Sequence, residues 1–152
     1  MILNNRQIHK FEEIEEIINK TDICYIALSD NNKPYILPFN FGYANKIIYL
    51  HSAIEGRKND IIQKNNNISL CFNPEYKLFH RDEQVACSYG MRYRSVIAEG
   101  KIYTVSDFND KVFILNIIMK KYTGKEFHYN APSINNVAVF KVEVDNFYGK
   151  KY

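Results

Sequence analysis

The stretch that most constrains the fold is KIIYLHSAIEGRK, residues 46–58, where a short apolar strand leads through a polar turn into a basic helix start. Its first half has strand composition, and residues 54–64 suit a short helix. A strand that feeds a helix start leaves free backbone N–H groups at the turn. Beside Ser52, Arg57 and Lys58, such groups form the kind of corner that attracts a phosphate.

Two interpretations of this corner compete. An Arg-Lys pair on the first turn of a surface helix is ordinarily a solvated face, and the pattern is less specific than a P-loop or a Rossmann glycine set. The choice between a solvated face and a phosphate site therefore depends on the rest of the chain.

The residues before this stretch predict two strands joined by a tight turn. Residues 22–29 (DICYIALS) are apolar on both faces, as expected for a central strand, and residues 33–43 form the second strand of a hairpin. Pro34 and Pro38 each remove a backbone donor, so this second strand should be irregular or lie at an edge, with backbone groups left free for a ligand. A further turn at residues 44–45 leads into the next strand and predicts a three-stranded meander.

The remaining segments complete the prediction. Strands are expected at residues 68–72 and 137–144, with one bent strand or two strands within residues 84–105. Apolar spacing predicts helices over residues 8–18 and 106–122, the second capped by Ser106 and ended by Gly124, and residues 73–83 and 125–136 are expected to be loops. The sum is six or seven mostly antiparallel strands with about three helices. The predicted fold class is therefore mainly β, a small β-barrel with flanking helices, in a single domain over residues 1–152.

Composition excludes several classes of function. The formal net charge is only +3 and the basic residues form no stripe, so no nucleic-acid partner is expected. Cys24, Cys71 and Cys87 are odd in number and lack any CxxC spacing, which favours reduced thiols in packing roles over a disulfide or a metal site. The chain has neither a leader pattern nor a run of about 18 apolar residues, so a cytoplasmic protein with no membrane segment is expected.

Three motifs in order resemble one known family. PYILPFNFGY (34–43), IYLHSAIEGRK (48–58) and YRSVIAEGK (93–101) are similar to the FMN-binding split barrels of the pyridoxamine 5'-phosphate oxidase-like superfamily, and within it to the nitroimidazole-resistance (Nim) proteins. The resemblance implies a six-stranded antiparallel split barrel. It also implies a homodimer with two FMN sites in the grooves between the subunits.

The resemblance assigns site residues position by position. Pro38, Phe39, Asn40 and Phe41 would lie along the isoalloxazine ring, and His51, Ser52 and Ala53 would line the same groove. Arg57 and Lys58 match the phosphate-binding basic pair of the family. Arg94, Ser95 and Val96 match the strand ahead of Glu99-Gly100, where the family contacts the ring or phosphate, partly from the partner subunit.

The same resemblance implies a flavin-dependent oxidoreductase similar to a nitroimidazole reductase, with a nicotinamide compound as the electron donor. His51 would be its catalytic residue, although a histidine at a strand end can equally be structural. The chain has no Trp and ends in VDNFYGKKY, unlike the C-terminal Trp and Arg-His segment of a vitamin B6 oxidase. The alternatives are a non-catalytic flavin-binding module and a haem-binding barrel with His80 and His128 as candidate ligands.

Overall fold

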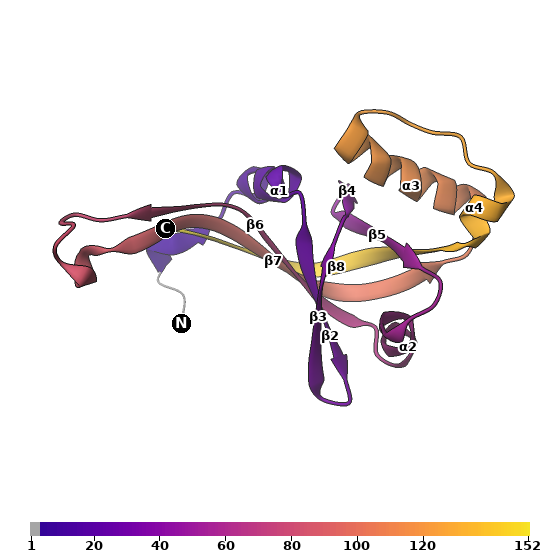
Figure 1. Ribbon diagram of the computed structural model, residues 1–152, viewed down its shortest axis with the longest axis horizontal. Helices are drawn as coiled ribbons and strands as arrows, with labels where there is room; N and C mark the ends of the chain where they lie inside the picture. Colours follow the sequence, from indigo (N-terminus) through magenta and orange to yellow (C-terminus); the bar gives the residue numbers. More distant parts are fainter. Residues whose placement is uncertain (1–3) are drawn as a thin grey trace.

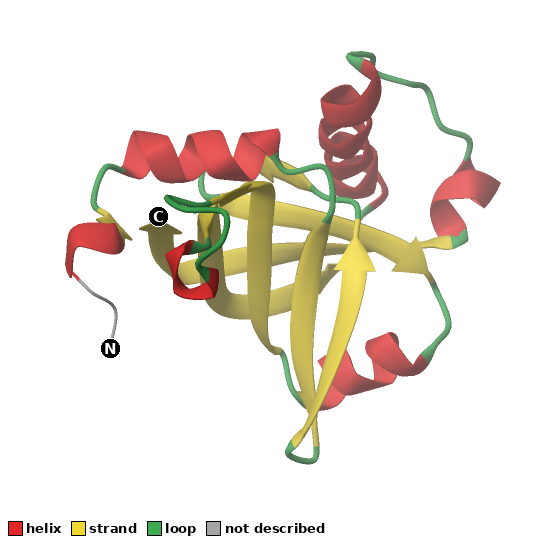
Figure 2. Cartoon of the chain, turned by 60° about the vertical axis from the view of Figure 1, so that its left-hand side comes forward, coloured by secondary structure: helices red, strands yellow, loops and turns green. Residues whose placement is uncertain are grey.

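A computed structural model describes residues 4–152, which form one curled antiparallel sheet of eight strands with helices around it (Figures 1 and 2). The strands are β1 (Gln7–Ile8), β2 (Cys24–Asp30), β3 (Lys33–Phe39), β4 (Gly42–Ala44), β5 (Ile47–Ala53), β6 (Asn67–Phe79), β7 (Gly90–Val105) and β8 (Val137–Lys151). The helices are α1 (Phe11–Lys20), α2 (Arg57–Lys64), α3 (Phe108–Thr123) and α4 (Ala131–Asn135), with short 3-10 turns η1 (Asn4–Arg6) and η2 (Ala86–Ser88). No helix among these residues is long and apolar enough to cross a membrane.

The strand order shows how the sheet closes. The order is β3-β2-β6-β7-β8-β5-β4, so β3 and β4 lie at opposite ends of the sheet. Only Asn40 and Phe41 separate Phe39, the end of β3, from Gly42, the start of β4. Because three peptide steps span at most about 11 Å, the two ends of the sheet must curl toward each other at this point. The result is a barrel that is split between its two edges, which confirms the predicted mainly β split-barrel class.

Two tight turns set the register of the strands around the split. Asn31 and Asn32 both have positive φ, which is the backbone of a two-residue hairpin turn, and Asp30 pairs with Lys33 across it. Asn45 and Lys46 form the equivalent turn between β4 and β5. The hairpin and both turns were predicted. The three-stranded meander was wrong, since β3 pairs only with β2, and β5 pairs with β4 and β8.

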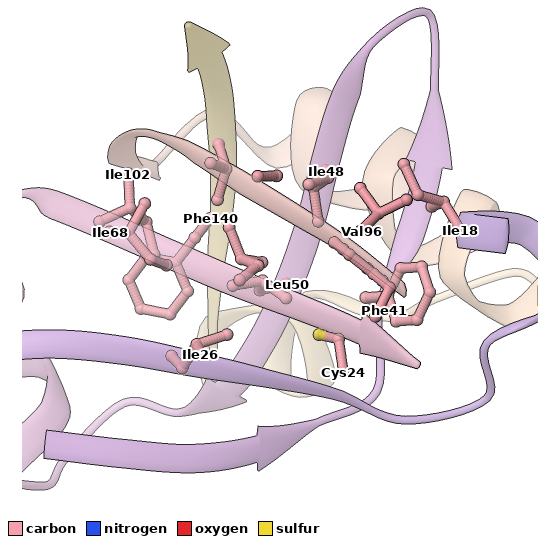
Figure 3. Packing of buried hydrophobic residues seen from close by; sticks show 14 of the residues in the cluster. Ile18, Cys24, Ile26, Phe41, Ile48, Leu50, Ile68, Val96, Ile102 and Phe140 are labelled. Atoms are coloured by element: carbon pink, nitrogen blue, oxygen red, sulfur yellow. The ribbon is translucent and has the colours of Figure 1, made fainter. Parts of the chain in front are cut away.

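The inner face of the sheet holds the main core. Fully buried side chains from most strands and from α1 meet there, and Figure 3 shows Cys24, Phe41, Leu50 and Val96 pointing into one cluster. Phe41 packs edge-on against Phe72 with ring centroids 5.1 Å apart. The outer face is covered only at one end, where α3 and α4 pack over β5 and β8.

Several predicted boundaries were wrong because long-range pairing extended the strands. Residues 73–79 belong to β6 rather than to a loop, since the strand passes Asn73-Pro74 through a bulge and pairs onward with β7. For residues 84–105 the alternative of one irregular strand is confirmed: residues 90–105 form β7, and the irregularity at Glu99/Gly100 comes from an extra residue in β8. β8 itself runs to Lys151 instead of ending at residue 144. The sheet has eight strands because the short β1 and β4 add to its margins.

Helix ends also differ in detail from the prediction. α1 begins at Phe11, because Gln7 and Ile8 pair with β8 instead. α3 is capped by Asp107, which accepts a hydrogen bond from the Asp110 amide, and not by Ser106. The predicted loop over residues 125–136 contains the short helix α4, whose cap is Asn130. The predicted stop at Gly124 is confirmed by its left-handed backbone.

We predict that Gly100→Ala lowers the free energy of unfolding by about 3 kcal/mol. A Cβ at Gly100 would overlap the carbonyl oxygen of Glu143, so β7 and β8 would have to separate at the bulge. Urea unfolding measures the change. Gly124→Ala is the control, because a Cβ there meets nothing and only the positive φ costs about 1 kcal/mol. Equal losses in the two variants would contradict the packing argument.

Candidate functional site

The candidate site lies along the split in the barrel. β3 pairs only with β2, and residues Leu50–Ala53 of β5 pair only with β8, so within residues 4–152 both strands carry an unpaired backbone edge. At one end of the split the link through Asn40 and Phe41 joins the two edges. At the other end α2 lies beside the tip of the β2–β3 hairpin (Figures 1 and 2). The seven residues of β3 give the edge a length of about 20 Å.

The basic end of the split is the corner predicted from the sequence. Arg57 donates a hydrogen bond to Asp30 at 3.3 Å, and its guanidinium lies 4.5 Å from the centre of the Tyr35 ring. Lys58 makes no ion pair with any described residue. The backbone N–H groups of Arg57 and Lys58 also have no acceptor among the described residues. Two cations and two free amides therefore meet where an anion would enter.

Gly56 makes this corner possible. It caps α2 with φ of 132°, a conformation that residues with a Cβ rarely adopt. Asn59 holds the preceding turn by donating hydrogen bonds to the carbonyls of Ala53 and Ile54. The turn is thus fixed by the protein, while the first amides of the helix remain open.

The opposite end of the split contains the residues assigned to the ring. Pro38 and Asn40 are exposed, whereas the side chain of Phe39 turns toward the core. Phe41 is fully buried, and its N–H donates to the Tyr122 hydroxyl at 3.1 Å. The side chain and the amide of Phe41 are therefore both engaged within the protein.

His51, Ser52 and Ala53 lie together on the free edge of β5, but their side chains diverge. His51 pairs with Val139 and Ser52 with Ala138, and successive residues of a strand point to opposite faces. Ser52 therefore shares the inner face with Leu50, and its hydroxyl donates to the Ala53 carbonyl at 3.0 Å. His51 shares the outer face with Tyr49. The side chains of His51 and Ser52 therefore point to opposite faces of the sheet, while the assignment of all three residues to a flavin groove stays a prediction.

Arg94, Ser95 and Val96 are not brought to the basic corner within one chain. Arg94 bonds to Glu75 and to Glu16, and the hydrogen bond to Glu75 raises the pKa of its guanidinium. Val96 is fully buried in the core, so its side chain cannot touch a ligand (Figure 3). By strand register Asp30 is level with Ile102, about 26 Å along β7 from Arg94. Within one chain, this segment therefore lies away from the Arg57 corner.

The sequence analysis missed Asp30 and Tyr35 as parts of the corner. Both lie on the β2–β3 hairpin, and both contact Arg57 across the split. An aspartate that begins a turn has an ordinary local explanation, so no sequence signal marked it. The contact depends on the curl of the whole sheet.

The histidines considered as haem ligands lie far apart. His80 follows β6 at the tip of the long β6–β7 hairpin and packs against Tyr89 with ring centroids 4.9 Å apart. His128 lies in the connection between α3 and α4, at the other end of the molecule (Figure 1). These two side chains do not share a site.

The cysteines have no part in the split. All three are unpaired thiols, and Cys24 is fully buried in the core. Burial raises the pKa of the Cys24 thiol to about 12, so it stays protonated at neutral pH and acts as a small apolar side chain.

Comparison with protein families gives one match, to the family model described as pyridoxamine 5'-phosphate oxidase, over residues 10–151. The chain belongs to the pyridoxamine 5'-phosphate oxidase family. This confirms the resemblance drawn from its three motifs. No curated protein sequence matches the chain.

Solved structures with a similar fold agree with this assignment. A proposed 5-nitroimidazole antibiotic resistance protein from Bacteroides thetaiotaomicron is 40% identical, with a TM-score of 0.86 over 95% of this chain and 86% of that chain. The FAD and heme binding protein of Mycobacterium smegmatis is 13% identical, with a TM-score of 0.85 over 96% of this chain and 73% of its own. The flavocytochrome Anf3 of Azotobacter vinelandii is 18% identical, with a TM-score of 0.84 over 99% of this chain and 72% of its own. The last two show that the fold is shared.

Proposed function

We propose that this protein binds FMN along the split and uses it to pass electrons from a nicotinamide donor to a small acceptor such as a nitro compound. The observation that carries the proposal is the end of the split, where Arg57, Lys58 and two free amides meet between two unpaired strand edges. The 40% identity to a proposed nitroimidazole resistance protein supports the choice of acceptor.

The residues fit the phosphate of a flavin mononucleotide. Arg offers paired hydrogen bonds and Lys a compact charge, and helix-start amides add donors aimed at the same point. The Arg57–Asp30 ion pair is no obstacle, because more than half of the Arg57 side chain is exposed and exposed pairs contribute little. A single corner of this kind matches one terminal phosphate, which favours FMN over a dinucleotide.

The rest of the split fits the remainder of the flavin. The edges of β3 and β5 offer free backbone donors and acceptors to the polar rim of a ring, and the exposed Pro38 offers apolar cover. Bound flavin supplies the electrons in this chemistry. On the outer face of β5, His51 carries ring N–H groups that can donate a hydrogen bond or a proton to an acceptor and so orient it.

We further propose that two copies of the chain form a homodimer through the outer face of the sheet, with the flavin sites at the interface. Strand register places Pro38, Tyr25, Cys71, Ile97 and Tyr148 in one row across five strands of that face. Tyr25 is 50% exposed and Ile36, in the next row, is 67% exposed. The apolar face continues onto the β6–β7 hairpin through Tyr76, Leu78 and Met91. An exposed apolar surface of this extent is typical of a protein interface.

The unpaired thiols favour a cytoplasmic location.

For the dimer, we predict that replacing Tyr25 and Ile36 together with Glu yields a monomer with weakened FMN binding. Two carboxylates on the apolar face would be buried without partners on association. Light scattering gives the mass, and flavin fluorescence gives the affinity. Phe113→Glu is the control, because Phe113 is 62% exposed but lies on α3. A wild-type monomer, or a double variant that remains a dimer, would contradict the interface.

For the phosphate corner, we predict that Arg57→Ala with Lys58→Ala weakens FMN binding at least about 100-fold, because it removes two charged donors. Absorbance of the purified protein and a flavin titration measure the loss. Lys64→Ala, at the other end of α2, is the matched control and should keep full occupancy. If the double variant remains fully loaded, the phosphate lies elsewhere.

For catalysis, we predict that His51→Ala keeps FMN occupancy but lowers the nitroreductase rate about 10²-fold or more, the usual effect of losing a proton donor. Steady-state assays with a nicotinamide donor and a nitroimidazole measure the rate, and the visible spectrum measures occupancy. An unchanged rate would remove His51 from the mechanism. A flavin-loaded wild type without turnover would instead identify a non-catalytic flavin-binding module.

A further inference from the structure

A cavity lies on the far side of α2 from the phosphate corner, which is the corner formed by Arg57 and Lys58. It has a volume of about 330 Å³ and opens between α2, the ends of β7 and β8, and the first turn of α3. The residues that line it include the apolar Ile54, Val137 and Phe140. The polar lining residues include Asn59, Thr104 and Lys111. An apolar lining with a few polar groups is the usual composition of a small-molecule site.

Lys111 gives the cavity its charge. It is the one charged side chain among the described residues that line the cavity. Its ammonium donates to the carbonyls of Val137 at 3.0 Å and Ile134 at 3.4 Å, which fixes its position. An ammonium has three N–H donors, so one remains for a ligand. A positioned cation without a lining carboxylate favours a monoanion.

Asn59 places a second requirement on the ligand, which is a hydrogen-bond donor. Its side-chain nitrogen holds the Ala53 and Ile54 carbonyls, while its side-chain oxygen is buried and accepts no hydrogen bond from the protein. A buried acceptor without a donor costs about 1–3 kcal/mol, so such atoms usually have a ligand or water partner. A ligand with its own hydroxyl or amino donor would satisfy it.

We propose that this cavity binds a small organic carboxylate that carries a hydrogen-bond donor. Lys111 pairs with the carboxylate, Asn59 accepts from the donor, and the apolar body of the ligand packs against the exposed side chain of Ile54. The volume is at the low end for ligand sites, which limits the ligand to about the size of a substituted benzoate.

This site is distinct from the flavin site. Arg57 and Asn59 are two residues apart on α2 and so point to nearly opposite sides of the helix. Gln63, one turn after Asn59, also lines the cavity. Ligand binding in this cavity is therefore independent of flavin binding, and the two proposals can be tested separately.

The test is a titration of the isotope-labelled protein as purified, followed by amide chemical shifts, with 4-hydroxybenzoate as the probe. We expect shifts confined to residues 54–63, 104–111 and 134–140. Two analogues test the chemistry: 4-hydroxybenzamide lacks the charge and should bind at least about tenfold more weakly, and benzoate lacks the donor and should also lose affinity.

Two variants test the location. Lys111→Met keeps the aliphatic stem and should weaken 4-hydroxybenzoate at least about tenfold, while Thr104→Trp fills the cavity without removing a hydrogen bond and should abolish binding. Lys120→Met, on the same helix but outside the cavity, and the Arg57/Lys58 double variant should bind as the wild type does. Absence of binding to the wild type at millimolar probe, equal binding of the neutral amide, or an unaffected Thr104→Trp variant would each overturn the proposal.

Discussion

The link through Asn40 and Phe41 is the constraint on which the structure depends. Two residues carry the chain from one end of the sheet to the other, so the sheet must curl and its two edges must approach each other. Within residues 4–152 these edges do not pair. Phe41 fixes the crossing because its ring is buried against Phe72 and its amide is bonded to Tyr122. The same crossing that closes the core therefore creates the open split beside it.

β3 and β5 contribute to the core through their side chains and to the split through their backbones. Their inner side chains fill the barrel, while the backbone edges that face the split stay unpaired within residues 4–152. At the far end, Arg57 bridges to the β2–β3 hairpin through Asp30 and Tyr35. A flavin phosphate would take over a cation that already joins the two sides, which ties the cofactor to the geometry of the fold.

Local patterns in the sequence identified much of this architecture. The two asparagine-containing turns with positive φ, the apolar stripe of α1 and the glycine after α3 could be predicted because each depends on neighbouring residues alone. The extent of β6 and β8 was not, because Asn73-Pro74 and Asp145 resemble breaks until their partners across the sheet are known. The separation of His51 from Ser52 across β5 followed from strand alternation and could have been predicted. The contact of Arg57 with Asp30 could not have been predicted, because it depends on the curl of the whole sheet.

The most direct test of the central claim compares the affinities of the protein for FMN and riboflavin, measured by flavin fluorescence on the cofactor-free chain. The two ligands differ only in the phosphate. If the corner of Arg57 and Lys58 holds that group, FMN binds at least about 100-fold more tightly than riboflavin. Affinities within threefold of each other would contradict the account.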